Sequence, residues 1–226
     1  MLRFDAEFAD RPHAGRRLAA ALDQFRGQDA VVLALPRGGV PVAFEVAKAL
    51  TAPLDVLIVR KIGAPGHQEL GLGAVVEGRD PQIVLNEEVV RLVAPPAGYI
   101  EAETVRQLAE IERRRRRYVG DRAPAPIAGT VAIVVDDGIA TGGTMKAALR
   151  GVRRHGPARL VLAVPVAPAD SLVALGAECD EIVCLATPEP FYAVGGHYRD
   201  FTQTEDDEVV ALLAAARAWS GAVRAG

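Results

Sequence analysis

Residues 130–148 constrain the fold of this chain more than any other stretch. They begin with a short apolar run, residues 130–135, which is rich in β-branched side chains and typical of a strand buried on both faces of a parallel sheet. The run ends in the acidic pair Asp136 and Asp137, and a loop of small residues separates this pair from a helical pattern that begins at Met145. The sequence therefore predicts a strand, two carboxylates, a loop and a helix, in that order.

The loop after the acidic pair has the composition of a phosphate site, with the residues Ala140, Thr141, Gly142, Gly143 and Thr144. Backbone N–H groups in such a loop, together with those of the following helix, converge on an anion. A phosphate bound here would bring Asp136 and Asp137 beside the sugar that carries it, where carboxylates accept hydrogen bonds from vicinal hydroxyls. A Walker A loop and a G-x-G-x-x-G fingerprint are both absent. The alternative is a doubly wound α/β protein in which one aspartate only caps a turn.

A second glycine turn follows another apolar run, residues 30–35. It contains Arg37, Gly38 and Gly39, and Pro41 stands where a helix can start. Taken alone, this motif is an ordinary turn. Together with the loop after the acidic pair it predicts two strand-end anion sites, as a sugar phosphate that also carries a diphosphate requires.

A third apolar run, residues 54–59, predicts a strand that delivers Arg60 and Lys61 to its carboxyl end. Open α/β sheets bind ligands at that end, and two cations there can neutralise a leaving diphosphate. The alternative is a solvated strand end. Residues 62–68 are expected to form a loop, and residues 69–76 and 81–85 a hairpin.

The sequence VVDDGIATGGT, residues 134–144, resembles the binding signature for phosphoribosyl pyrophosphate (PRPP) of type I phosphoribosyltransferases. In that family the acidic pair holds the ribose hydroxyls and the loop wraps the 5′-phosphate. The resemblance implies that the catalytic residues are Asp136, Asp137, Arg37 and Lys61. It implies 5′-phosphate binding by Ala140, Thr141, Gly142, Gly143 and Thr144, and pyrophosphate binding by Arg37, Gly38, Gly39, Arg60 and Lys61. It also implies a cis peptide bond, with Arg37–Gly38 as the candidate.

The implied cofactor is Mg²⁺, bound chiefly by PRPP and water, and no protein side chain is assigned as a direct metal ligand. The implied reaction transfers the ribose 5-phosphate of PRPP to a nitrogenous base and releases pyrophosphate, as in nucleotide salvage. The sequence leaves open whether the base is a purine or a pyrimidine.

The alternation of strands and helices predicts an α/β fold with a mostly parallel central sheet and helices on both faces. We expect a single domain over residues 1–226. Its core covers about residues 30–186, and a small hood begins near residue 187 and runs to residue 226, with the N-terminal segment as a further contributor.

Aromatic residues gather in the tail of a chain otherwise poor in them: Phe191, Tyr192, His197, Tyr198 and Phe201. A comparable segment forms the hood over the base in purine-salvage phosphoribosyltransferases. That resemblance implies that Phe191 or Tyr192 stacks on the base. The alternative is that these rings seal the core of the hood itself.

A different class of function is a non-catalytic sensor of PRPP or nucleotides that binds RNA through residues 113–117, which are five consecutive arginines. A run of like charges is more often a solvated helix face. The net charge of −3 gives no general argument for nucleic acid, so we do not expect a nucleic-acid partner.

Composition sets the remaining expectations. Half of the 226 residues are hydrophobic, which is enough for a full core, and no apolar run reaches membrane-spanning length. Only two cysteines, Cys179 and Cys184, are present, and no secretory signal precedes the first strand. We therefore expect a cytoplasmic protein without a membrane partner. The sequence leaves the oligomeric state open, with a homodimer as one option.

Overall fold

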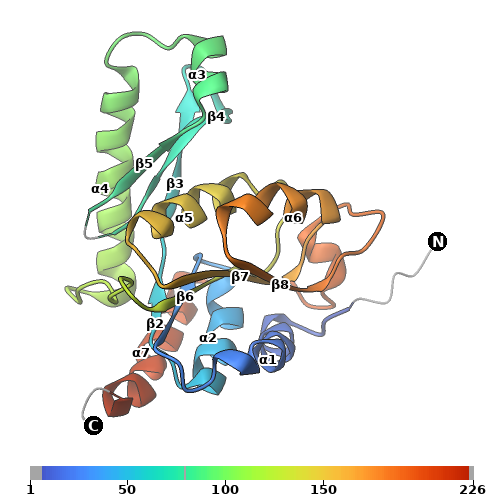
Figure 1. Cartoon of the computed structure of the whole chain (residues 1–226). Helices are drawn as coiled ribbons and strands as arrows, with labels where there is room; N and C mark the ends of the chain where they lie inside the picture. Colours follow the sequence, from blue (N-terminus) through green and yellow to red (C-terminus); the bar gives the residue numbers. More distant parts are fainter. Residues whose placement is uncertain (1–6, 79, 224–226) are drawn as a thin grey trace.

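The computed structural model describes residues 7–78 and 80–223, and a five-stranded parallel sheet lies at its centre (Figure 1). The strand order is β2-β1-β6-β7-β8, and every neighbouring pair is parallel. The strands are β1 (Ala30–Ala34), β2 (Leu54–Val56), β6 (Val131–Val135), β7 (Arg159–Val166) and β8 (Glu181–Ala186). The sheet places the two apolar runs that precede the glycine turns, β1 and β6, side by side.

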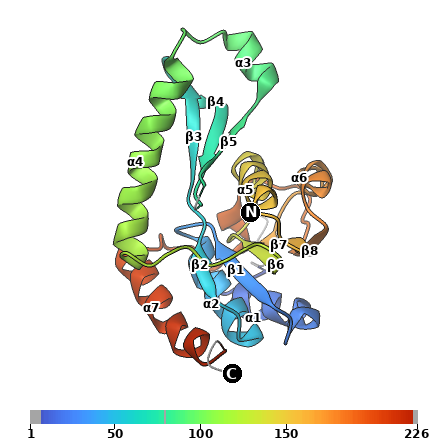
Figure 2. The same ribbon diagram turned by 60° about the vertical axis from the view of Figure 1, so that its left-hand side comes forward.

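Helices cover both faces of this sheet, as the sequence predicted (Figure 2). One face carries α1 (Arg11–Ala21), α2 (Gly39–Leu50) and α7 (Asp206–Val223), and the other carries α5 (Gly143–Arg154) and α6 (Ala169–Leu175). Successive side chains of a strand point to opposite faces. In β1, Val32 and Ala34 accordingly join the core under α1 and α2, whereas Val31 and Leu33 join the core under α5. β1 and β6 are apolar at every position because both of their faces are covered.

A three-stranded antiparallel arm projects from one side of the sheet (Figures 1 and 2). It consists of β3 (Val59–Ala64), β4 (His67–Val76) and β5 (Gln82–Leu85), followed by α3 (Glu87–Val93) and the long helix α4 (Tyr99–Val119). The predicted β4–β5 hairpin is confirmed. The prediction of one strand over residues 54–59 and a loop from residue 62 was wrong, because pairing with β4 continues β3 through Ile62 and Gly63. The turn is confined to Pro65 and Gly66, where Gly66 adopts a positive φ of 72°.

A buried cluster of charges connects the arm to the sheet. Arg115 of α4 forms an ion pair of 3.2 Å with Asp55 of β2 and is also hydrogen-bonded to Glu77, which follows β4. Arg122 reaches Asp55 at 2.8 Å, and Glu77 accepts a hydrogen bond of 2.9 Å from the backbone N–H of Ile58. Burial raises the pKa of Glu77 to about 7, although Arg115 opposes the rise. The middle arginine of the five is therefore a buried structural residue, not part of a solvated face.

The tail after β8 folds together with the beginning of the described chain. The N–H of Phe8 donates to the carbonyl of His197 at 3.0 Å, and the N–H of Arg199 donates to the carbonyl of Phe8 at 2.9 Å. Phe8 and Tyr198 form a small apolar cluster with Ala14 and Val166. The sequence predicted a hood that runs to residue 226, and residues 224–226 lie outside the described part of the chain. The last helix of this segment, α7, packs on α2 and α4.

Two findings bear on the compositional expectations. Cys179 and Cys184 are free thiols. Among the helices of residues 7–78 and 80–223, none combines the length and the apolar character needed to cross a membrane.

Candidate functional site

The two glycine turns meet at the carboxyl edge of the parallel sheet. β1 and β6 pair in register, and beyond them the N–H of Leu35 donates to the carbonyl of Val135 at 2.9 Å. A Cβ on Gly38 would lie 2.0 Å from Oδ2 of Asp137, and a Cβ on Gly39 would lie 2.9 Å from the carbonyl oxygen of Val135. Both positions therefore require glycine, since any side chain would force the two turns apart.

The turn that contains Arg37, Gly38 and Gly39 has its cis peptide bond one position earlier than expected. The cis peptide bond joins Pro36 to Arg37, not Arg37 to Gly38. Gly38 already has helical angles, with φ −59° and ψ −33°, and leads directly into α2. The guanidinium of Arg37 faces the start of α7, where Nη1 lies 3.6 Å from Oε2 of Glu205 and 3.8 Å from Oδ1 of Asp206.

The acidic pair combines two partly buried carboxylates. Burial raises the pKa of Asp136 well above its ordinary value, and the neighbouring charge of Asp137 raises it further. Burial also raises the pKa of Asp137, but the guanidinium of Arg11 opposes this, with Nε 2.8 Å from Oδ2. Two adjacent acids thus share one nearby cation, and the pair is suited to accept further hydrogen-bond donors or a cation.

The small-residue loop ends in an uncapped helix. Gly142, with φ 76°, is the N-cap of α5 and offers no side chain to the first N–H groups. Its neighbours Thr141, Gly143 and Thr144 lie at the surface. The Oγ of Ser171 donates to the carbonyl of Ala140 at 2.9 Å, which anchors the loop from the α6 side. The arrangement leaves donors accessible at the positive end of a helix dipole, as a bound phosphate requires.

Arg60 and Lys61 lie in the arm strand β3 and not at the end of a sheet strand. Arg60 donates from Nε to Oε1 of Gln107 at 3.0 Å, so its guanidinium is directed towards α4. Lys61 is exposed and, because side chains alternate along a strand, points to the other face of the arm. The structure thus separates two residues that the sequence placed together.

The two aromatic candidates of the tail have different surroundings. Phe191 stacks on His197 with ring centroids 5.2 Å apart and an angle of 28° between the ring planes. Tyr192 is 81% exposed. The tail lies close to the acidic pair, because a Cβ on Gly138 would come 2.5 Å from Cγ1 of Val194.

Asp137 is contacted by Arg11, to which the sequence assigned no role, and by Tyr198, one of the tail aromatics. Arg11 binds its carboxylate, and the Oη of Tyr198 donates to its backbone carbonyl at 2.6 Å. Arg11 precedes Asp137 by 126 positions, and no local pattern connects them. The sequence analysis named the N-terminal segment only as a further contributor to the hood.

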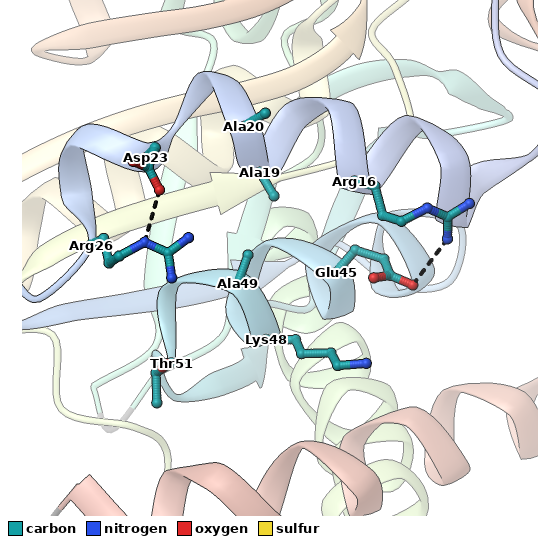
Figure 3. A pocket seen from close by; sticks show the side chains of 9 residues that line it. All are labelled: Arg16, Ala19, Ala20, Asp23, Arg26, Glu45, Lys48, Ala49 and Thr51. Atoms are coloured by element: carbon teal, nitrogen blue, oxygen red, sulfur yellow. Dashed lines mark hydrogen bonds and ion pairs between the residues drawn. The ribbon is translucent and has the colours of Figure 1, made fainter.

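A large surface groove lies away from this site, between α1 and α2 (Figure 3). Its volume is about 750 Å³, and its floor is formed by alanines such as Ala19 and Ala49. Two of the charged side chains that line the groove, Arg26 and Asp23, form an ion pair of 2.8 Å with each other. The groove contains none of the residues predicted to bind ligand, so its size does not identify the site.

Comparison with known proteins identifies the family. A model of the phosphoribosyl transferase domain matches residues 7–193. This chain belongs to the phosphoribosyl transferase family. The family assignment and the α/β fold predicted from the sequence are thereby confirmed.

Relatives of this phosphoribosyl transferase are known in bacteria. It is 54% identical over 206 residues to "Putative phosphoribosyl transferase Rv0571c" of Mycobacterium tuberculosis H37Rv, and equally to the protein "MT0597" of strain CDC 1551. Each match covers 91% of this chain but 46% of the relative, so the chain spans about half the length of the curated relatives it matches. The crystal structure of TT1426 from Thermus thermophilus is 45% identical, with a TM-score of 0.80, and the match covers 92% of this chain and 98% of that one.

Proposed function

We propose that this phosphoribosyl transferase moves the ribose 5-phosphate of PRPP to a ring nitrogen of a base and releases pyrophosphate. One observation carries the proposal: the turn of Gly38 and Gly39 touches the carboxylates of Asp136 and Asp137 at the ends of adjacent strands. A ligand with phosphates at both ends of a pentose would suit this arrangement, because its sugar would lie over the acids and each phosphate against one turn.

The proposed reaction asks for positioning and charge stabilisation more than for covalent chemistry. Asp136 and Asp137 would accept hydrogen bonds from the ribose hydroxyls, and residues 140–144 would donate to the 5′-phosphate. Arg37 and the amides of Gly38 and Gly39 would hold the pyrophosphate. For this, the diphosphate must compete with Glu205 and Asp206, which lie near Arg37 in the present arrangement. Lys61, on the arm, would support the leaving charge, whereas Arg60 is engaged by Gln107.

Magnesium fits the site as an ion carried by the substrate. Within residues 7–78 and 80–223, no group of three or more histidine, cysteine, aspartate or glutamate side chains is arranged to hold a metal. The carboxyl oxygens of the acidic pair nevertheless lie beside the guanidinium of Arg11. Mg²⁺ bound mainly by diphosphate oxygens and water would suit these surroundings, and it would neutralise charge on the departing pyrophosphate.

Tyr192 is the better candidate for contact with the base. Its side chain is exposed, whereas the ring of Phe191 already stacks on His197. An exposed aromatic face offers a flat heterocycle a stacking partner. The class of base is left to experiment.

The rival proposal is a non-catalytic sensor of PRPP. Its RNA-binding form has little support, because all five arginines of the run pair with acids of the chain itself. The acids are Glu110 for Arg113 and Arg114, Asp55 and Glu77 for Arg115, Glu112 for Arg116, and Asp206 and Asp207 for Arg117.

The test is to incubate the protein with PRPP, Mg²⁺ and a panel of purine and pyrimidine bases and to measure pyrophosphate. We expect release with one base, a loss of at least a hundredfold in Asp137→Asn, and full activity in Asp121→Asn, where the exposed carboxylate lies outside the site. PRPP binding without turnover on any base would favour the sensor. No PRPP binding by the unaltered protein would exclude both.

A further inference from the structure

The guanidinium of Arg11 joins the acidic pair to the tail through three contacts. Its Nε donates to Oδ2 of Asp137 at 2.8 Å, and its Nη1 donates to the backbone carbonyl of Thr202 at 2.7 Å. Its Cζ lies 3.9 Å from the ring centroid of Phe201. Only 10% of the Arg11 side chain is exposed, so its surroundings are almost entirely protein.

The local sequence gives no reason for an arginine at this position. Arg11 is the first residue of α1, directly after the N-cap Asp10. A cation at the N-terminus of a helix is opposed by the helix dipole. The tertiary contacts must therefore account for its placement, and two of them are with residues of the tail.

We propose that Arg11 is a positioning residue, which orients the carboxylate of Asp137 for the ribose and keeps residues 198–204 closed beside it. Arg11 holds Oδ2, and that oxygen also lies against Gly38, so the second oxygen, Oδ1, is the one that receives a ribose hydroxyl. The hydrogen bond from Tyr198 to the carbonyl of Asp137 adds a second link between tail and acidic pair. This inference rests on the proposed function.

The experiment compares Arg11→Gln and Arg11→Lys with Arg16→Gln. Arg16 is a matched control on the same helix, because it pairs with Glu45 of α2 at 3.4 Å and lines the groove between α1 and α2. Three quantities are measured: the Kd for PRPP, kcat and KM with the accepted base, and hydrogen exchange of residues 198–204. Arg11→Gln should raise the KM for PRPP at least tenfold, with a smaller change in kcat, and speed the exchange at least tenfold. Arg16→Gln should change neither.

The lysine variant separates charge from geometry. A lysine keeps a cation beside Asp137 but cannot also reach Thr202 and cover the ring of Phe201. Arg11→Lys should therefore recover part of the PRPP affinity while the tail still exchanges fast. Wild-type KM and exchange in either Arg11 variant would overturn the inference.

Chemical rescue provides a readout that a general loss of stability would not produce. A pocket of about 180 Å³ is lined by Arg11 together with Pro41, Asp200 and Thr202, so a small solute has access to this position. Millimolar guanidinium should restore PRPP affinity to Arg11→Ala, and equal sodium chloride should not. Failure of this rescue in a folded Arg11→Ala contradicts the inference. If the unaltered protein neither binds nor converts PRPP, the proposed function itself has failed.

Discussion

The α-carbon of Gly38 faces the carboxylate of Asp137 so closely that a Cβ at position 38 would lie 2.0 Å from Oδ2. We expect Gly38→Ala to destabilise the protein by about 1–3 kcal/mol, because the two turns must move apart, and to weaken PRPP binding. Gly176→Ala is the control, since nothing lies within 4 Å of a Cβ there. Urea unfolding and PRPP titration of both variants measure the effects. Equal behaviour of the two would show that the turns are not in contact.

Two neighbouring arginines of the five should differ sharply in their effect on stability. The side chain of Arg115 is 13% exposed between Asp55 and Glu77, whereas that of Arg116 is 70% exposed and pairs only with Glu112. Arg115→Gln leaves buried carboxylates without their cation and should lower the free energy of unfolding by about 3–5 kcal/mol. Arg116→Gln should change it by less than about 1 kcal/mol. Denaturant unfolding at pH 7 distinguishes the two, and similar values would contradict the buried cluster.

The buried cluster should also make stability depend on pH. Glu77 has a pKa of about 7 in the fold against an ordinary 4.5, so between these values the folded protein holds a proton that the unfolded chain has lost. Stability therefore falls as pH rises through this window, by up to about 3 kcal/mol. Glu77→Gln should remove this part of the decline between pH 5 and pH 8, while Glu112→Gln, at an exposed position, should retain it. An unchanged decline in Glu77→Gln would show that another group causes it.

Substitution of Tyr192 should affect binding of the base, and substitution of Phe191 should affect the stability of the tail. Tyr192→Ala removes an exposed ring and should leave the unfolding free energy within about 0.5 kcal/mol, while it raises the KM for the base. Phe191→Ala removes the partner of His197 and should speed hydrogen exchange around residues 191–197. Steady-state kinetics with the accepted base and exchange measurements on both variants test the assignment. A normal KM for the base in Tyr192→Ala would mean that the base does not stack there.

Local patterns in the sequence were sufficient for most of the sheet and for the position of both turns. The apolar runs of β1 and β6, each followed by glycines, predict buried strands that end in anion-binding turns. Burial on both faces requires consecutive apolar residues, and close approach of the backbone to an anion requires glycines directly after them. The same local reasoning missed β3. Gly63, Pro65 and Gly66 indicate a loop from residue 62, and only pairing with β4 continues the strand through Ile62 and Gly63.

The amino-acid sequence by itself determined most of the order of strands and helices and placed an acidic pair and a loop of small residues directly after a buried strand, since these features depend on neighbours in the chain. The tertiary structure alone decided that Arg11 meets Asp137, that Arg115 is buried with Asp55 and Glu77, and that Arg60 is directed towards Gln107. Each of these contacts joins residues at least 38 positions apart. When two side chains are this far apart in the sequence, they meet only because the sheet, the arm and the tail pack together, and no periodic pattern in the sequence predicts such a contact.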